Sequence, residues 1–155
     1  MIIEKGKIED AKSIAQFQVD MAMESEGYEL SLDEVIRGVT MALEDENKAT
    51  YLVAKTDEGK AIGSLMLTKE WSDWHAKWYL WIQSVYVAPE YRQQGVYRSL
   101  YAKVKEIAKA ENYSQIRLYV DKDNLRGQTV YQHLGMHESH YLMYEKAGIY
   151  YQKAK

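Results

Sequence analysis

The segment Lys77–Val87, KWYLWIQSVYV, constrains the fold of this chain more than any other stretch, because nearly every position is apolar or aromatic. A strand with one wet face alternates between apolar and polar residues, whereas a strand covered on both faces reads as a continuous apolar run. We therefore expect a strand near the centre of a sheet, with other elements packed on both of its faces. Pro89 ends this strand, since proline cannot donate to a strand ladder.

The segments around this strand predict its neighbours. SLDE, at Ser31–Glu34, is a capping box that opens an amphipathic helix, and TYLVAK and AIGSLML form a hairpin through the turn TDEGK. Apolar periodicity predicts the remaining elements: strands at MIIEKGK, IRLYV and SHYLMYEK, and helices at Glu9–Glu24, from Gly95 to near ENYS, and over NLRGQTVYQHLG. The expected order is βααβββαβαβ.

Composition narrows the class of protein. With 155 residues, 46% hydrophobic and 28% charged, the chain suits one globular domain over residues 1–155. It has no cysteine, which excludes disulfides, thiolate metal sites and a cysteine nucleophile. A net charge of -3 disfavours nucleic acid and anionic membrane as partners. The charged N-terminus and the lack of a long apolar run indicate a cytoplasmic protein.

The stretch RQQGVYR, from Arg92 to Arg98, lies where the central strand gives way to a helix. The first backbone N–H groups of that helix and its dipole favour an anion such as phosphate. Gly95 permits a positive φ or a close backbone approach, and Arg92 and Arg98 add permanent charge. The spacing fits neither a P-loop nor a dinucleotide fingerprint. By itself, a lone glycine with arginines nearby favours a simple tight turn between strand and helix.

Together, VYVAPEYRQQGVYRSLY and NLRGQTVYQHLGM resemble the GNAT superfamily of N-acetyltransferases, over nearly the whole chain. The acetyl-CoA motif of that family matches from Arg92 to Val96, and Tyr97 stands where a small residue is usual. The second motif is matched by Asn124, Tyr131, Leu134, Gly135 and Met136. The resemblance implies the family's α/β fold (α+β in some schemes), a central mixed, mostly antiparallel sheet of about six strands with four flanking helices.

The resemblance also implies acetyl-CoA as co-substrate. Its pyrophosphate would bind at the turn and helix start, and its pantetheine arm would pair with the strand edge at Val85 and Val87. The cofactor-binding residues are then Val85, Val87, Arg92, Gln93, Gln94, Gly95, Val96, Tyr97, Arg98 and Asn124. Tyr131 would donate a proton to the departing thiolate, since a phenol pKa of about 10 exceeds that of a thiol, about 8.5. The alternative for Tyr131 is simple packing on a helix face.

The acceptor site is less defined. Candidate acceptor-binding residues are Glu24, Glu26, Trp71, Trp74 and Gln83, because aromatic rings and acids suit a cationic amine. The tryptophans could instead pack at a hairpin tip or dimer contact, and the acids could simply be solvated. The general base stays open among Glu24, Glu26, Glu70, Asp73 and His75. No metal is expected, since Gly135 separates His133 from His137 and His140.

These observations favour an enzyme that moves an acetyl group from acetyl-CoA to a primary amine by direct attack in a ternary complex. A small-molecule acceptor is favoured over a protein. One alternative is a non-catalytic acyl-CoA-binding or sensing module, suggested by Tyr97 and by the lack of an acid on the central strand, where Gln83 and Ser84 lie. The other is a protein N-acetyltransferase, and a homodimer is a further hypothesis.

Overall fold

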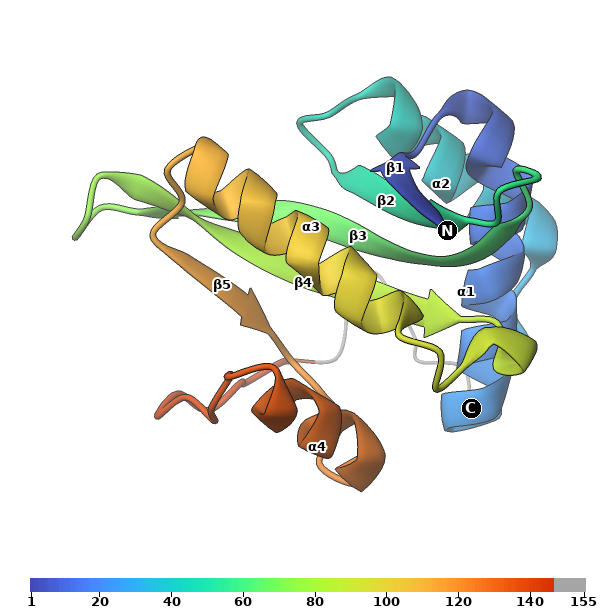
Figure 1. The fold of residues 1–155 in the computed structure, drawn as a ribbon. Helices are drawn as coiled ribbons and strands as arrows, with labels where there is room; N and C mark the ends of the chain where they lie inside the picture. The colour runs from blue at the N-terminus through green and yellow to red at the C-terminus, as the bar shows by residue number, and fades with distance from the viewer. Residues whose placement is uncertain (147–155) are drawn as a thin grey trace. The chain divides into compact units, whose positions relative to one another are not determined.

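A computed structural model describes residues 1–146. Its contacts divide the chain into two compact units, Met1–Tyr119 and the part from Val120 onward, and each is described by itself. The first unit contains a five-stranded sheet with the strand order β1-β2-β3-β4-β5 (Figure 1). The described part of the second unit, as far as residue 146, contains one helix. A single domain over residues 1–155 stays a prediction.

The elements follow the predicted order from the N-terminus as far as the last helix. The strands are β1 (Ile2–Lys5), β2 (Thr50–Lys55), β3 (Ala61–Ser72), β4 (Lys77–Val87) and β5 (Gln115–Leu118). The helices are α1 (Ala11–Glu26), α2 (Leu32–Glu44), α3 (Val96–Ala110) and α4 (Leu125–His133), with short 3-10 turns η1 (Ile8–Asp10) and η2 (Pro89–Tyr91). The first four strands pair antiparallel, and β5 pairs parallel with β4.

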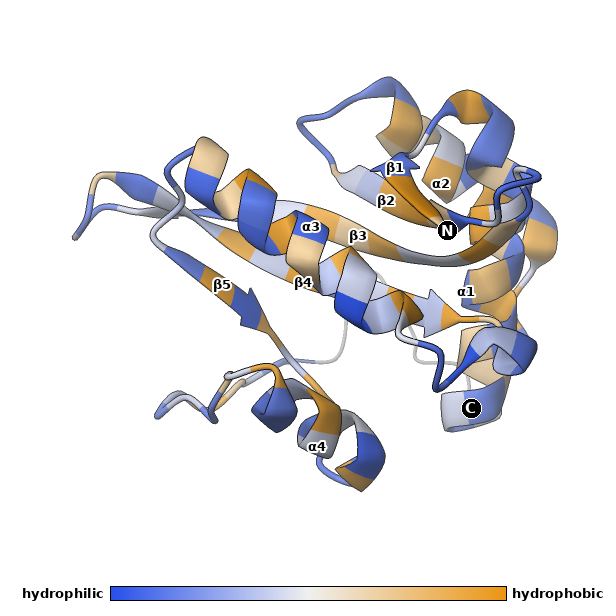
Figure 2. Cartoon of the chain, in the orientation of Figure 1, coloured by the Kyte–Doolittle hydropathy of each residue, from blue (hydrophilic) through white to orange (hydrophobic). Residues whose placement is uncertain are grey.

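The core of the first unit has two halves, one on each face of the sheet. On one face, α1 and α2 pack on β2 through a buried cluster that includes Ile14, Val39 and Val53. On the other face α3 crosses the sheet (Figure 1), with Leu100 and Val104 fully buried. In Figure 2 the hydrophobic residues of α2 and α3 alternate with hydrophilic ones, as expected for helices with one buried face.

Half of the predicted capping box is present, the hydrogen bond to the Ser31 side chain. The side chain of Ser31 accepts a hydrogen bond from the Glu34 amide at 3.3 Å, and α2 begins at the next residue, Leu32. The hairpin of β2 and β3 also forms as predicted, with Gly59 at φ +91 in its turn. Local turn and cap chemistry therefore placed these boundaries correctly.

The expectation that β4 is covered on both faces is wrong along the whole strand, because Val85 and Val87 in its second half are also only half-buried. Leu80 and Ile82 are buried, but Trp78 is 40% exposed and Tyr79 and Trp81 are only half-buried. The aromatic residues here contact other surface rings: Trp78 lies edge-on to Trp71, with ring centroids 5.0 Å apart. An aromatic run can thus arise from rings stacked on a partly wet face as well as from full burial.

The final strand expected at Ser139–Lys146 is also wrong, since these described residues form no strand. The sheet therefore has five strands within the described part of the chain, where about six were expected. The amide of Tyr141 donates instead to the Ser139 hydroxyl at 3.0 Å. Such local side-chain bonds offer the backbone an alternative to a strand ladder, which alternation in the sequence cannot foresee.

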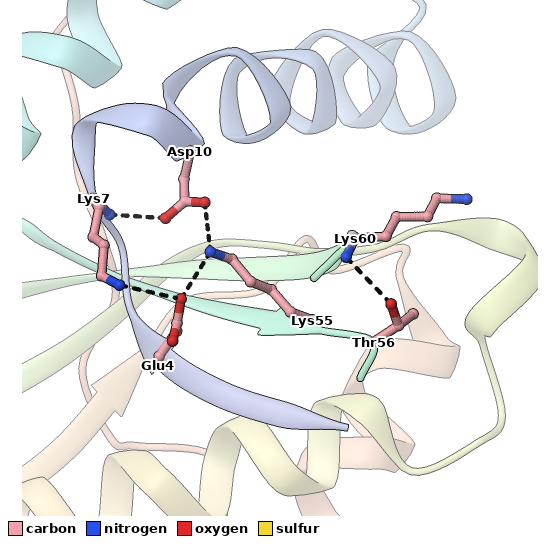
Figure 3. Close-up of polar contacts among 6 residues, drawn as sticks. All are labelled: Glu4, Lys7, Asp10, Lys55, Thr56 and Lys60. Carbon is pink, nitrogen blue, oxygen red and sulfur yellow. Dashed lines mark hydrogen bonds and ion pairs between the residues drawn. The ribbon is translucent and has the colours of Figure 1, made fainter. Parts of the chain in front are cut away.

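The side chain of one buried lysine, Lys55, forms ion pairs that join β1 and η1 to the β2–β3 hairpin (Figure 3). The Lys55 ammonium lies 2.7 Å from a Glu4 oxygen and 2.8 Å from an Asp10 oxygen, and the other Asp10 oxygen accepts from the Lys7 amide. The side chains of Lys55 and Asp10 are 12% and 7% exposed. The hydrogen bonds to Asp10 and Glu4 raise the pKa of Lys55, and the bond from Lys55 lowers the pKa of Glu4. Lys55 and Glu4 are therefore charged at neutral pH.

Replacing Lys55 should destabilise the fold, because Asp10 would keep a buried charge without its partner. We expect Lys55→Met to lower the free energy of unfolding by about 3–5 kcal/mol, measured by urea denaturation at pH 7. Lys60→Met is the matched control: this exposed lysine lies 3.9 Å from Glu90 and should change stability by less than about 0.5 kcal/mol. Equal effects of the two substitutions would contradict a role for the buried cluster.

Candidate functional site

Strand β4 has two partners along only part of its length. It pairs with β3 as far as Val87, but with β5 only from Tyr79 to Ile82. From Gln83 onward, the edge of β4 that faces away from β3 has no strand partner in the described part of the chain. The sheet therefore opens at this point and exposes backbone groups that an extended ligand can bind.

A bulge in β4 lies where the two strands part. Ser64 is opposite Tyr86 and Met66 is opposite Gln83, so Leu65 alone faces the two residues Ser84 and Val85. Ser84 has φ +53, an uncommon conformation for a residue with a Cβ. A bulge bends the strand that carries it and increases the local twist, which accounts for the departure of β4 from β5.

The backbone direction of the open edge follows from one hydrogen bond. The Ala88 amide donates to the Ile62 carbonyl on β3 at 2.9 Å, so Ala88 faces β3. Successive residues of a strand alternate in direction, and the amides of Val87 and Val85 therefore point to the open edge. These are the two residues for which the resemblance implies contact with pantetheine. That role stays a prediction, and the geometry makes both donors available for it.

The turn after β4 has a left-handed backbone at Gly95, one of the two conformational uses that a glycine permits there. Gly95 has φ +80 and caps α3, and Gln93 also has a positive φ of 61. The helical ladder starts with the bond from the Ser99 amide to the Gly95 carbonyl, so the amides before Ser99 precede it. The start of α3 thus has the donors and the dipole that suit an anion.

Tyr97, the departure from the family motif, makes its aromatic contact within α3. Its ring centroid lies 6.3 Å from that of Tyr101, one turn further along the helix, with the planes tilted by 37°. Tyr101 is itself buried at 6% exposure. The Tyr97 ring is therefore half-buried beside its own helix, and Gly95 stays exposed with open space around its Cα.

The two arginines of the turn behave differently. Arg92 was expected to flank the anion, but its Nε donates to the Val87 carbonyl and its Nη2 lies 2.8 Å from a Glu24 oxygen. Its guanidinium also stacks on the Tyr86 ring, 5.1 Å from the centroid. Arg98 is exposed on the first turn of α3. The structure thus turns Arg92 toward α1, and cofactor binding by either arginine stays a prediction.

Glu24 and Tyr86 hold opposite protonation states. Burial by itself raises the pKa of Glu24, but hydrogen bonds from Tyr86 and Arg92 outweigh it and the pKa falls below 4.5. The Tyr86 phenol, which donates to Glu24 at 2.8 Å, has its pKa raised to about 12 by burial and by that carboxylate. At neutral pH a carboxylate therefore accepts from a neutral phenol and a guanidinium. A carboxylate with a lowered pKa is a weak base.

The predicted acceptor-binding residues do not all lie on the same face of the sheet. Gln83 accepts a hydrogen bond from Thr68 at 2.8 Å and faces the α1 side of the sheet. Trp71 is opposite Trp78 in the β3–β4 pairing, and Trp78 is an odd number of residues from Gln83 along β4. Because successive side chains of a strand point to opposite faces, Trp71 and Trp78 lie on the other face of the sheet. Trp74 is in the hairpin turn at 84% exposure. Binding of an acceptor by these side chains, and by exposed Glu26 at the end of α1, stays a prediction.

Sequence reasoning missed a polar and aromatic cluster on the face that carries Gln83. A Glu70 oxygen accepts from Trp81 Nε1 at 2.8 Å and from Arg117 at 3.3 Å. The Arg117 guanidinium stacks 3.9 Å from the centroid of Tyr79. The register of the β3–β4 hairpin could have revealed the Glu70–Trp81 pair. The contact of Tyr86 with Glu24, 62 residues apart, had no signal in the sequence.

The second unit contains the second motif. Asn124 caps α4 as predicted, with its side chain accepting from the Gly127 amide at 2.9 Å. Gly135, at φ +87, follows the helix end. Tyr131 lies on α4, and its catalytic role and the contact of Asn124 with CoA stay predictions.

The described residues contain neither a metal-binding cluster nor a helix able to cross a membrane. Within residues 1–146, no three histidine, aspartate or glutamate side chains lie close enough together to hold a metal ion. None of the described helices has the length and apolar character needed to span a bilayer.

The sequence matches the model of the acetyltransferase (GNAT) family over residues 15–136. Among curated proteins, 56 residues are 39% identical to the thialysine N-epsilon-acetyltransferase of Bos taurus, a match that covers 36% of this chain and 33% of that enzyme. The chain therefore spans about a third of that relative.

Solved structures are similar over almost the whole chain. A structure described as a possible acetyltransferase from Clostridium difficile 630 is 41% identical, with a TM-score of 0.89, covering 96% of this chain and 98% of that one. The ribosomal-protein-alanine N-acetyltransferase of Brucella melitensis biovar Abortus 2308 has a TM-score of 0.78 at 16% identity, covering 96% and 100%. At that identity the second likeness concerns the fold alone.

The position of Gly63 offers a test of the packing beneath the site. A Cβ on Gly63 would lie 2.9 Å from the Tyr86 carbonyl oxygen and 3.4 Å from side chains of Val87 and Val96. We expect Gly63→Ala to cost about 1–3 kcal/mol of unfolding free energy, because β4 or the start of α3 must shift. Denaturant unfolding measures this loss.

The matched control for this substitution is Gly38→Ala. Gly38 is exposed on α2 with nothing within 4 Å of an added Cβ. Alanine there should raise stability by up to about 1 kcal/mol, as it does in helix interiors. A harmless Gly63→Ala would show that β3 and α3 do not confine the end of β4.

Proposed function

This chain belongs to the acetyltransferase (GNAT) family, and from that premise we propose that it is an N-acetyltransferase using acetyl-CoA and a small primary amine. One observation carries the proposal. The open edge of β4, with the Val85 and Val87 amides facing outward, leads directly into the turn at Gly95 and the start of α3. An extended arm and the pyrophosphate attached to it would meet matching donors in that order.

Acetyl-CoA fits this surface as a substrate. Its pantetheine amides would pair with the β4 edge, and its pyrophosphate would accept from the backbone between Gln93 and Arg98. The Arg98 side chain, exposed on the first turn of α3, adds a positive charge there. Gly95 has open space where a Cβ would be, so the phosphates would meet no side chain at the tightest point of the turn.

The proposed reaction is direct acyl transfer. The amine nitrogen attacks the thioester carbonyl carbon, the C–N bond forms, and the C–S bond breaks. A backbone N–H of β4 would stabilise the oxyanion, and Tyr131 would protonate the departing thiolate. The attacking amine loses its proton to water. Glu24 is poorly suited to this task, because its pKa is lowered and each of its carboxylate oxygens already accepts a hydrogen bond.

The names of relatives support a small acceptor. The cattle enzyme that shares 39% identity with a segment of this chain is named for acetylating the ε-nitrogen of thialysine. The structural neighbour named for a protein substrate shares only 16% identity. We therefore favour a free amine, with a protein N-terminus or lysine as the alternative. Mass spectrometry of cell extract incubated with labelled acetyl-CoA would detect acetylated proteins if the alternative holds.

Release of CoA thiol from acetyl-CoA in the presence of a panel of amines tests the proposal. We expect turnover with at least one amine, and Tyr131→Phe should be slower by about an order of magnitude or more, because the thiolate loses its proton donor. Tyr144→Phe is the matched control, since Tyr144 is 89% exposed, and it should keep the full rate. An unchanged rate in Tyr131→Phe would remove that residue from the mechanism.

Calorimetry separates the enzyme from a non-catalytic module. Acetyl-CoA binding together with turnover supports the enzyme. Binding without turnover on any amine supports an acyl-CoA-binding or sensing module. A lack of binding would reject both functions.

A further inference from the structure

We infer that Glu24 is a positioning residue, which holds Arg92 and thereby fixes the end of β4 and the turn that leads into α3. This inference rests on the proposed function, because it concerns the surface that would bind acetyl-CoA. It differs from the expectation for both residues, in which Glu24 receives the acceptor amine and Arg92 faces the phosphates.

The contacts form a closed set across three segments. Glu24, near the end of α1, accepts from the Tyr86 phenol through one oxygen and from Arg92 Nη2 through the other, each at 2.8 Å. Arg92 Nε donates in turn to the Val87 carbonyl at 2.8 Å. Both carboxylate oxygens and two of the guanidinium nitrogens therefore have protein partners.

The set is more rigid than an ordinary surface ion pair. The side chains of Glu24 and Arg92 are 44% and 38% exposed, which alone would suggest a weak contact. However, both bind Tyr86, which is 5% exposed and fixed by packing against Phe17, with ring centroids 5.6 Å apart. The guanidinium also stacks on the Tyr86 ring. Because Tyr86 is buried and fixed, the side chains of Glu24 and Arg92 lose less conformational entropy when they pair.

The bond to Val87 has a direct consequence for the open edge of β4. It occupies the Val87 carbonyl, and it joins the last residue of β4 to the residue that follows η2. Within the same turn, the Tyr91 amide donates to the Ala88 carbonyl and the Arg92 amide to the Pro89 carbonyl. Backbone bonds and the Arg92 side chain therefore both hold this turn, and the chain passes from it through Gly95 into α3.

Substitution of Glu24 distinguishes this role from the opposite one. If Arg92 were a phosphate ligand that Glu24 merely sequesters, then removing the charge of Glu24 would free Arg92 and tighten CoA binding. If Glu24 positions the turn, the same change weakens binding. The sign of the effect thus decides between the two.

The experiment is calorimetry of CoA binding to the full chain, with Glu24→Gln and Tyr86→Phe as variants. We expect about a tenfold rise in Kd for Glu24→Gln, the size typical of a lost charge-assisted hydrogen bond, and a smaller rise for Tyr86→Phe. In steady-state assays the KM for acetyl-CoA should rise while kcat changes less than about threefold. Asp20→Asn is the matched control: it removes the same charge one turn earlier on α1 and should leave Kd unchanged.

A double-substitution cycle adds a second criterion. Arg92→Gln combined with Glu24→Gln should bind CoA no more weakly than Arg92→Gln alone, because Glu24 acts through Arg92. Additive losses, an unchanged Kd or a lower Kd in Glu24→Gln would each overturn the inference.

Hydrogen exchange of the free protein gives a readout that needs no ligand. The Tyr91 and Arg92 amides, which bond within the turn, should exchange faster in Glu24→Gln than in the parent chain, while amides of the β2–β3 ladder stay unchanged. If the parent chain fails to bind CoA but this exchange changes, the proposed function fails and the positioning role stands. Unchanged exchange at Tyr91 and Arg92 would contradict the positioning role itself.

Discussion

The site depends on the unequal pairing of β4, which has β3 beside it over its whole length and β5 beside only four residues. A strand inside a sheet must satisfy backbone groups on both edges, and a strand that loses one neighbour presents donors and acceptors to whatever else can bind them. The bulge at Ser84 marks this change of partner. After the bulge, the amides of Val85 and Val87 point to the open edge, and the turn at Gly95 comes next along the chain.

Helix α1 is held near both of its ends by charged groups. At its start, Asp10 binds the buried Lys55 of the hairpin, and near its end Glu24 binds Arg92 and Tyr86. Between them, Gln18 reaches toward the carbonyl of the bulge residue Ser84 at 3.5 Å. The helix therefore connects β2 with the place where β4 opens.

The aromatic residues of the β3–β4 hairpin divide between the two faces of the sheet. Trp71 and Trp78 stack on one face, and Trp81 with Tyr79 lies on the other beside Glu70 and Arg117. In the sequence these rings form a single dense group. Pleating separates them, because side chains of successive strand residues point to opposite faces. Only the second group shares a face with Gln83 and can take part with it in one site.

The sequence by itself determined the features that depend on local chemistry. The Ser31 cap, the Asn124 cap and the turn of the β2–β3 hairpin each follow from residues close together in the chain, and each is present. Only the tertiary structure decided which way Arg92 points, that Glu24 meets Tyr86 across 62 residues, and that Ser139–Lys146 forms no strand. Such outcomes depend on partners distant in the chain, and neither spacing nor composition specifies which partner a side chain or strand edge finds first.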